Sequence, residues 1–396
     1  MSEWQTFCLK DLGKIVGGAT PPTNNPKNYG NKIAWITPKD LSTLQGRYIK
    51  KGSRSISRLG FKSCSCVLLP KHAILFSSRA PIGYVAIAEK RLCTNQGFKS
   101  IIPNKKIYFE FLYYLLKYHK DNISNIGGGT TFKEVSGATL GLFEVKIPPT
   151  YYEQQKIART LSILDQKIEN NHKINELLHK ILELLYEQYF VRFDFLDENN
   201  KPYQTSGGKM KFSKELNRLI PSGWSVRFLN HKIVSTYQPK TISKTLLNNS
   251  YSYSVYGGGG IIGRFTEYNH EQSEFIISCR GQCGISYLTL PKSWITGNAM
   301  VIRPTKSYTS KTYLYHTIKK YKLTNYITGS VQPQITRQNL STMPILIPKR
   351  KTLNKWNNIS SLLWNLIHNN MQSTQTLTAL RDFLLPLLLK QQVKPK

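Results

Sequence analysis

The chain has 396 residues and a formal charge of +33, from 55 Lys and Arg against 22 Asp and Glu. Its length allows two or three domains, and a hydrophobic content of 40% excludes a disordered chain. So large a positive charge indicates a polyanionic partner, with nucleic acid the first candidate and a membrane surface the second. No apolar run is long enough to cross a bilayer or to form a signal peptide.

Residues 1–150 are predicted to form a first α+β domain with a curved sheet. Short runs of β-branched and aromatic residues alternate with turns rich in Gly, Pro and Asn, which is typical of strands in a mixed fold. An aromatic-rich segment, 109–120, predicts one helix within this domain.

Residues 151–198 are predicted to form a long helix. Apolar residues recur there at alternating spacings of four and three, the pattern of a coiled-coil seam. The seam residues that we expect to pack are Ile157, Leu161, Leu164, Ile168, Leu178 and Leu185.

Residues 199–348 are predicted to contain a linker and a second domain that repeats the first. FSSRAPIG at 76–83 matches ISCRGQCG at 277–284, and IIP at 101–103 matches IRP at 302–304. NIGGG at 125–129 then matches YITGS at 326–330, and VKIP at 145–148 matches ILIP at 345–348. The order of the matches is kept throughout, which indicates a tandem duplication, and two copies are too few for a solenoid.

Residues 349–396 are predicted to form the second long helix, which pairs with the first in an antiparallel coiled coil. Its expected packing residues are Leu363, Leu366, Leu377, Leu380 and Leu384. Asn171 and Asn370 fall at equivalent positions in the two seams. An Asn in an apolar seam can fix the register of two helices, or it can simply border the seam, and the pattern leaves both interpretations open.

The charge is concentrated on the two repeated domains. Residues 1–150 carry 22 basic and 8 acidic residues and 199–348 carry 19 and 4, whereas 151–198 carry 6 and 9. A helix that gripped DNA along its length should be basic. The first helix is therefore expected to act as a spacer or a protein contact, and the uncharged stretch 356–380 also suits a protein interface. The basic tail at 390–396 has no assigned role.

Catalytic motifs are missing, so we expect a binding protein. IPPTYY at 147–152 lacks the leading Asn or Asp of an amino-methyltransferase loop, GGK at 207–209 is not a phosphate-binding loop, and GGGG at 257–260 is expected to be a turn.

The six cysteines fit a reducing cytoplasm, and neither the pair 64/66 nor the pair 279/283 has the second pair of ligands that a zinc site needs. The sequence thus predicts neither a metal site nor a cofactor bound by this chain.

Five segments of the chain stand out as motifs: LGKIVGGATP at 12–21, IAWITPKD at 33–40, EQQKIA at 153–158, LDQKI at 164–168 and TLTALRDFLLP at 376–386. They resemble one family, the specificity subunits of Type I restriction-modification enzymes. The first two resemble the start of that family's target recognition domain, and the other three resemble its conserved helices. The second domain keeps a Trp in WSVRFLN at 224–230, but STYQP at 235–239 replaces the Gly-Gly-x-Thr-Pro turn.

The resemblance implies two target recognition domains, each binding one half of a bipartite, asymmetric site on double-stranded DNA. It implies that the paired helices set the distance between the half-sites; a helix of about 40 residues is about 60 Å long, which is an upper limit for this distance. It also implies two modification subunits, which carry S-adenosylmethionine and methylate adenine at N6, and restriction subunits, which use ATP and Mg²⁺. The sequence does not reveal the bases or the spacing of the site.

Candidate DNA-binding residues occupy matching places in the two copies. Arg79 and Arg280 follow equivalent strands, and an arginine shared by both copies is expected to contact phosphate or to support the fold, because base-reading residues should differ. The loops after the aromatic-rich helices could bring backbone close to phosphate or could simply be turns. The other candidates are Lys99, Gly128, Thr130, Thr131, Lys133, Ser330, Gln332, Gln334 and Arg337.

Two other functions compete with this interpretation. A self-sufficient methyltransferase or nuclease is disfavoured by the missing motifs, and binding of S-adenosylmethionine by the isolated chain would revive it. A tandem RNA-binding scaffold could use the 23 Tyr residues to stack on unpaired bases, and a preference for single strands over duplex would favour it.

Overall fold

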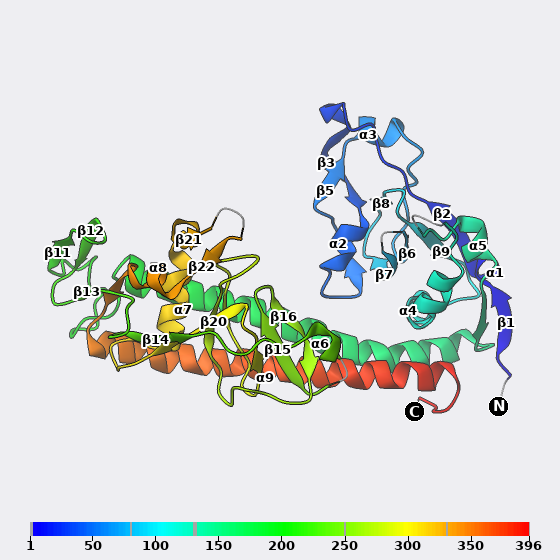
Figure 1. Ribbon diagram of the computed structural model, residues 1–396. Helices are drawn as coiled ribbons and strands as arrows, with labels where there is room; N and C mark the ends of the chain where they lie inside the picture. The colour runs from blue at the N-terminus through cyan, green and yellow to red at the C-terminus, as the bar shows by residue number, and fades with distance from the viewer. Residues whose placement is uncertain (1–2, 80, 130–132, 249–250, 330–331, 396) are drawn as a thin grey trace. The chain divides into compact units, whose positions relative to one another are not determined.

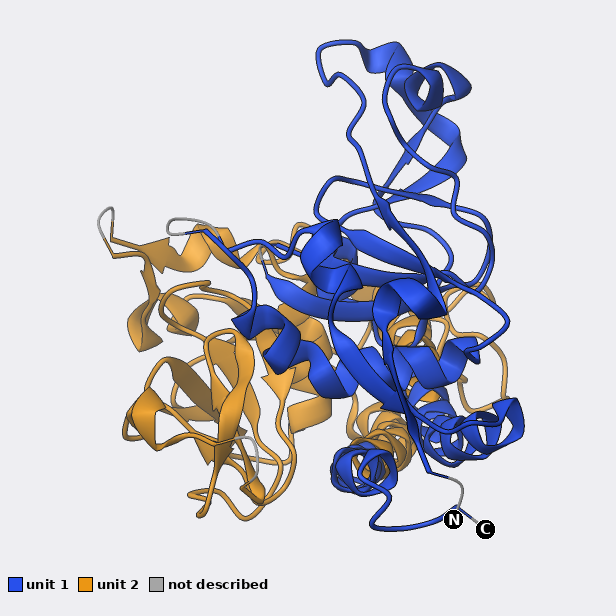
Figure 2. Ribbon diagram, turned by 90° about the vertical axis from the view of Figure 1, so that its right-hand side faces the viewer, with its two compact units in different colours: residues 1–173, 372–396 blue, residues 174–371 orange. Residues whose placement is uncertain are grey.

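The computed structural model describes residues 3–79, 81–129, 133–248, 251–329 and 332–395. The chain divides into two compact units, which Figure 2 shows in different colours: unit 1 contains residues 1–173 and 372–396, and unit 2 contains residues 174–371. The division cuts through both long helices, α6 (Tyr151–Tyr186) and α9 (Arg350–Leu389), so each unit combines one β-rich domain with part of each helix (Figure 1).

The domain of unit 1 contains ten strands and a few short helices among its described residues. The strands are β1 (Gln5–Cys8), β2 (Gly13–Gly17), β3 (Tyr29–Ile36), β4 (Tyr48–Ile49), β5 (Arg54–Ile56), β6 (Ile74–Ser78), β7 (Ile82–Ala88), β8 (Cys93–Thr94), β9 (Lys99–Pro103) and β10 (Glu144–Ile147). The helices are α1 (Leu9–Leu12), η1 (Pro26–Asn28), α2 (Pro38–Ser42), α3 (Arg58–Lys62), α4 (Phe109–Asn125) and α5 (Gly137–Gly141).

The domain of unit 2 follows a similar order after α6 and a short π-helical turn, η2 (Glu187–Val191). Its strands are β11 (Met210–Ser213), β12 (Arg218–Pro221), β13 (Ser225–Phe228), β14 (Val234–Tyr237), β15 (Tyr253–Gly257), β16 (Gly260–Phe265), β17 (Phe275–Ser278), β18 (Ser286–Leu288), β19 (Trp294–Ile295), β20 (Ala299–Pro304), β21 (Ile327–Thr328), β22 (Gln334–Ile335) and β23 (Pro344–Ile347). Its helices are η3 (Lys244–Leu246), α7 (Lys311–Lys320), η4 (Leu323–Tyr326) and α8 (Arg337–Ser341).

The strand pairing confirms the duplication. The main sheet of unit 1 has the order β2-β9-β6-β7-β4, and that of unit 2 has the order β14-β20-β17-β18. A second sheet has the order β5-β3-β8 in unit 1 and β16-β15-β19 in unit 2, with the last pair parallel in both. The pair β1-β10 likewise matches the pair β13-β23. The predicted α+β class with two tandem domains is therefore correct.

The central strands are buried on both faces. In β6, Ile74 and Phe76 join a core with α4 and the long helices, whereas Leu75 between them joins a core with the second sheet. In β17, Phe275 and Ile277 face α7 and the long helices, and Ile276 faces the second sheet. Because successive side chains of a strand point to opposite faces, a continuous apolar run here produces three layers: second sheet, main sheet and helices.

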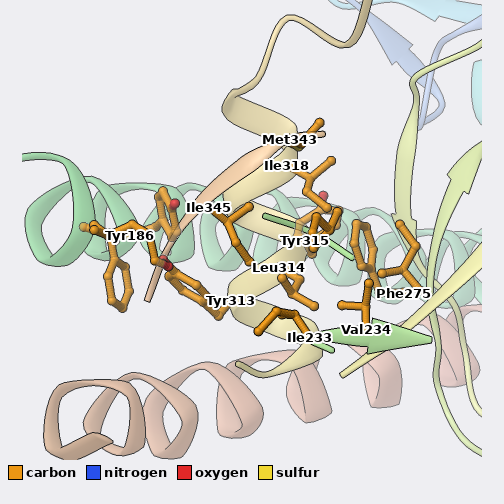
Figure 3. Packing of buried hydrophobic residues seen from close by; sticks show 14 of the residues in the cluster. Tyr186, Ile233, Val234, Phe275, Tyr313, Leu314, Tyr315, Ile318, Met343 and Ile345 are labelled. Atoms are coloured by element: carbon orange, nitrogen blue, oxygen red, sulfur yellow. The ribbon is translucent and has the colours of Figure 1, made fainter. Parts of the chain in front are cut away.

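The core of unit 2 shows how its domain is attached to the long helices. Figure 3 shows Tyr313, Leu314 and Tyr315 of α7 among side chains from α6, β14, β17 and β23. The same core contains Tyr186 of α6 and Trp356 of α9, both buried, and their rings lie 5.8 Å apart at 77°. Edge-to-face aromatic contacts of this kind add to the hydrophobic stabilisation of a core.

The long helices pair antiparallel within each unit, as predicted. In unit 1, Asn171 Nδ2 donates to Thr374 Oγ1 at 3.2 Å. In unit 2, Asn370 Nδ2 donates to Asn175 Oδ1 at 2.9 Å, and Asn175 Nδ2 donates to the carbonyl of Ile367 at 3.3 Å. Asn171 and Asn370 thus both bond across the helix pair, and Asn370 does so from a position beside the buried stripe of α9.

The predicted seam of α9 is wrong by one position. Leu366 and Leu380 are 44% and 43% exposed, and Leu363, Leu377 and Leu384 are only half-buried. The buried residues of α9 instead include Leu353, Trp356, Ser360, Trp364, Ile367, Leu385 and Leu388. The reason is that the uncharged stretch has apolar residues on adjacent stripes, so periodicity alone does not choose between them.

The predicted seam of α6 agrees better with the structure. Ile157, Leu161 and Ile168 are buried, and Leu164, Leu178 and Leu185 are half-buried. The helix ends earlier than predicted, however, because the π-helical turn stops at Val191 and Phe193 has a φ of +59°.

The predicted linker after it contains the hairpin β11-β12, and the Gly-rich segment 257–260 forms the turn between β15 and β16, as expected.

Gly18 and its neighbour Gly17 offer a test of the entry to the first domain. A Cβ on Gly18 would lie 2.1 Å from the carbonyl oxygen of Asn95 and 2.4 Å from that of Thr94, whereas a Cβ on Gly17 would meet nothing within 4 Å. Because the obstacle is backbone, Gly18→Ala is expected to lower the free energy of unfolding by about 1–3 kcal/mol. Gly17→Ala is the control and should change it by less than about 1 kcal/mol. Urea unfolding measures both, and equal effects would contradict the close packing at Gly18.

Candidate nucleic-acid interface

In unit 1, three chain segments meet just beyond the end of β6. Glu134 forms one antiparallel bridge with Arg79 and another with Gly128. The backbone N–H of Gly128 donates to the carbonyl of Glu134 at 3.0 Å, and the reverse bond is 2.9 Å. Val135, which is fully buried, donates its N–H to Ser78 at 3.0 Å and anchors the segment in the core. We call these three segments of unit 1, which pair at Arg79, Gly128 and Glu134, the first ribbon.

Unit 2 contains the same arrangement, which we call the second ribbon. Gln334 forms an antiparallel bridge with Arg280 and pairs with Thr328 in the β21-β22 hairpin. The backbone N–H of Ile335 donates to the carbonyl of Cys279 at 3.1 Å, and Ile335 is buried as Val135 is. The predicted match of Arg79 with Arg280 therefore holds in the structure, since both arginines flank the same kind of bridge.

The side chains of the first ribbon form a small ion cluster. Lys99 Nζ lies 3.3 Å from Glu134 Oε1, and Arg79 Nη1 lies 3.7 Å from Glu134 Oε2. The side chains of Arg79 and Glu134 are each 38% exposed and that of Lys99 is 21% exposed. Ion pairs this accessible contribute little to stability, so either cation can exchange the carboxylate for a phosphate at small cost.

Most of the other predicted DNA-binding residues lie at the surface of the two ribbons. Gly128, Lys133, Arg280, Gln332, Gln334 and Arg337 are all exposed. Arg337 is the first residue of α8, so it stands two residues beyond the buried Ile335. Thr130, Thr131 and Ser330 lie outside the described residues.

Glycine is required in both loops by backbone conformation. Gly129 and Gly329 have φ values of +110° and +91°, which side chains rarely tolerate. A Cβ on Gly329 would also lie 2.6 Å from the carbonyl oxygen of Gln332, whereas one on Gly128 would meet nothing within 4 Å. The turn interpretation is thus sufficient for Gly129 and Gly329, while the space beside the Gly128 Cα is open and its N–H and carbonyl are both paired with Glu134.

Sequence reasoning missed Glu134. The predicted residues include Lys133 in the first copy and Gln334 in the second. The bridges instead set Glu134 against Gln334 and Lys133 against Pro333. The match of VS at 135–136 with IT at 335–336 already gave this alignment, because each segment leads into a short helix capped by a hydroxyl side chain.

A second exposed surface lies on the long helices and is apolar. Ile174, Leu177, Ile181 and Leu184 of α6 are between 44% and 61% exposed in unit 2. In the same unit, Ile359, Leu362 and Leu366 of α9 are between 37% and 62% exposed. In unit 1 the exposed apolar residues of these helices include Ile163, Leu380 and Phe383. Apolar residues that follow a helix at this spacing and remain uncovered indicate an interaction surface.

Within the described part of the chain, no group of three or more His, Cys, Asp or Glu side chains could hold a metal ion. All six cysteines are unpaired thiols in the structure. No described helix is long and apolar enough to cross a membrane.

Comparison with known proteins decides the family. A model described as the Type I restriction modification DNA specificity domain matches residues 1–180 and 221–380. The chain belongs to the specificity subunits of Type I restriction-modification systems. Both matched segments contain one domain of the duplication and the beginning or main part of the helix that follows it.

Individual relatives agree with this family. The MjaIX specificity subunit of Methanocaldococcus jannaschii is 32% identical over 98% of this chain and 92% of its own length. The HindI specificity subunit of Haemophilus influenzae is 31% identical over 46% of this chain and 40% of its own length. The crystal structure of a Type I S subunit from M. genitalium superposes with a TM-score of 0.60, at 18% identity and covering 97% of this chain and 96% of that one, which supports the fold.

Proposed function

We propose that this specificity subunit recognises a bipartite, asymmetric site on double-stranded DNA, with each recognition domain binding one half-site. The observation that carries the proposal is the repetition of one exposed, arginine-bearing ribbon in both domains. Both domains are also strongly basic, with formal charges of +14 for 1–150 and +15 for 199–348. Phosphate contacts from such surfaces supply affinity, and the residues that differ between the ribbons supply specificity.

We further propose that the chain itself is not a catalyst and positions partner subunits on DNA. Two modification subunits would bring S-adenosylmethionine and methylate adenine at N6, and restriction subunits would bring ATP and Mg²⁺. The similarity to specificity subunits of restriction enzymes supports this division of work. The DNA partner and the six unpaired thiols support a cytoplasmic location.

The proposal is tested by reconstituting adenine methylation. The modification subunits, with and without this chain, are incubated with S-adenosylmethionine and a random-sequence DNA library, and methylated adenines are mapped by long-read sequencing. We expect methylation only with the chain present and only at one bipartite sequence. Methylation at unrelated sites without the chain would overturn the proposal, and a preference of the chain for unpaired RNA over duplex DNA would favour an RNA-binding scaffold instead.

The exposed apolar residues of α6 and α9 are the proposed contact for the modification subunits. Leu177 and Leu362 are 61% and 62% exposed, so each could bury most of its side chain against a partner. Fully burying a leucine contributes about 1.5–3 kcal/mol, and a charge placed there adds a desolvation cost. Leu362→Glu is therefore expected to weaken binding of the modification subunits at least tenfold without lowering the melting temperature.

Ser361 provides the matched control for this variant. It is exposed on the same helix and beside Leu362, but it is not one of the exposed apolar residues. Ser361→Glu introduces the same charge and should leave binding of the modification subunits within about threefold of wild type. Size-exclusion chromatography and calorimetry of the purified subunits measure both variants, and equal losses would contradict an apolar contact at Leu362.

A further inference from the structure

Positions 134 and 334 are structurally equivalent but chemically different. Both lie between the same two neighbours in the ribbons, with Arg79 or Arg280 on one side and Gly128 or Thr328 on the other. Residue 134 is a glutamate and residue 334 is a glutamine. The two side chains have the same length and shape and differ in charge.

A second difference accompanies the first. β9 and β20 both end in a proline that pairs with the first residue of the neighbouring strand, Pro103 with Gly13 and Pro304 with Val234. Four residues before these prolines lie Lys99, which contacts Glu134, and Met300, which is buried.

In the first ribbon, Glu134 contacts Lys99 and Arg79, whereas in the second the neutral Gln334 pairs with Arg280 and Lys99 has no charged counterpart. Counting these paired residues alone, the formal charge is +1 in each ribbon. What differs is hydrogen bonding: a carboxylate only accepts hydrogen bonds, whereas an amide both donates and accepts them.

We propose that residues 134 and 334 are equivalent specificity-determining residues, through which two domains of one fold read different bases. This inference rests on the proposed recognition of duplex DNA. In the major groove a glutamate accepts a hydrogen bond from the N4 amino group of cytosine, whereas a glutamine bonds both N6 and N7 of adenine. The arginines shared by the ribbons then contact phosphate in both half-sites, and the residue between the paired strands supplies the difference.

The backbone of each ribbon holds this residue firmly in place. The next residue is buried in both units, and the one after it caps a short helix: Ser136 Oγ accepts from the N–H of Thr139 at 3.0 Å, and Thr336 Oγ1 accepts from the N–H of Asn339 at 3.1 Å. Because this backbone is already fixed, little backbone conformational entropy is lost when the side chain binds a partner. The side chain itself remains accessible, since that of Glu134 is 38% exposed and Gln334 is also exposed.

Reciprocal exchange of the two side chains tests the proposal in the complete modification complex. Glu134→Gln and Gln334→Glu are prepared separately, and methylated sites selected from a random-sequence library are compared with those of the wild type. Glu134→Gln should change the preferred base from cytosine to adenine at one position of one half-site, with a change in discrimination of about 10- to 100-fold. Gln334→Glu should make the opposite change in the other half-site only.

Lys133→Ala serves as the control, because Lys133 is exposed and adjacent to Glu134 without pairing in a bridge. It should lower the affinity for all sites alike and leave the preferred bases unchanged. The inference is overturned if both exchanges leave the preferred bases unchanged, or if either one alters both half-sites. Failure of the proposed function is distinguishable from these results, because the wild-type chain would then direct methylation to no bipartite site.

Discussion

Replacing Arg381 with alanine is expected to lower the free energy of unfolding by about 3–5 kcal/mol, because it leaves a buried carboxylate without its cation. Arg381 Nη1 lies 2.7 Å from Asp165 Oδ1, and the side chains of Arg381 and Asp165 are only 12% and 5% exposed. Burial alone would lower the pKa of the Arg381 guanidinium, but the Asp165 carboxylate raises it above its ordinary value. The pair joins α6 to α9 within unit 1, so its loss weakens the helix pairing.

Tyr114 extends this contact into the first recognition domain. Its hydroxyl donates to Asp165 Oδ2 at 2.6 Å, and Tyr114 is fully buried in α4. One hydrogen bond from a neutral donor compensates only part of the desolvation of a carboxylate.

Two controls separate the buried pair from the rest of the arginine's contacts. Asp382 also pairs with Arg381, at 2.8 Å, but it is 55% exposed, and Asp382→Ala should cost less than about 1 kcal/mol. The double variant Asp165→Leu with Arg381→Met replaces the charges with side chains of similar size and should be much closer to wild type than Arg381→Ala. Urea unfolding measures all three, and an Arg381→Ala loss no larger than that of Asp382→Ala would contradict the argument.

The architecture was predictable from the sequence because its signals are long and repeated. The order of matched segments fixed two copies of one domain, and spacings of four and three gave two helices that pair. The exact packing stripe of α9 was not predictable, because Trp356, Ser360 and Trp364 on the buried stripe look no more seam-like than Ile359 and Leu366 beside them. Tertiary contacts with α7 and its aromatic residues, far away in sequence, decide which stripe is covered.

The candidate interface was predictable in place and only partly in residues. Both arginines follow a buried strand, and both glycine-bearing loops follow an aromatic-rich helix, so the sequence located the ribbons. Glu134 escaped notice because an acidic residue does not suggest DNA binding when it is considered by itself. Its pairing with Arg79 and its equivalence to Gln334 are consequences of strand pairing, which a single sequence does not display.

In unit 2, His316 of α7 is buried and His368 of α9 is half-buried, and the pKa of each lies below its ordinary value. Burial, with Lys319 and His179 adding to it, lowers the pKa of His316 to about 3. Burial, with Lys311 and His179 adding to it, lowers the pKa of His368 to about 4. Among the described residues, Nε2 of His316 and Nε2 of His368 have no hydrogen-bond partner, so no acceptor stabilises the protonated form.

Unit 2 is consequently expected to lose stability as the pH falls below 6.5. The unfolded chain binds protons at these histidines below about pH 6.5, whereas the folded chain does so only near pH 3–4. Stability is therefore fully present above pH 6.5 and declines as the pH falls toward the folded values. Between pH 7.5 and pH 5 the expected loss is about 2 kcal/mol for each histidine, or roughly 4 kcal/mol for the two.

A variant without the titrating ring at position 316 provides the measurement. His316 stacks on Tyr186 at 5.5 Å and meets Trp356 edge-on at 5.3 Å, so phenylalanine can keep these contacts without binding a proton. His316→Phe should remove about 2 kcal/mol of the pH-dependent loss in urea unfolding, whereas His231→Gln, at an exposed position, should remove none of it. If the free energy of unfolding of His316→Phe changes with pH as steeply as that of the wild type, groups other than His316 govern the acid sensitivity. The reason is that phenylalanine binds no proton, so the contribution of His316 to the pH dependence must disappear in this variant.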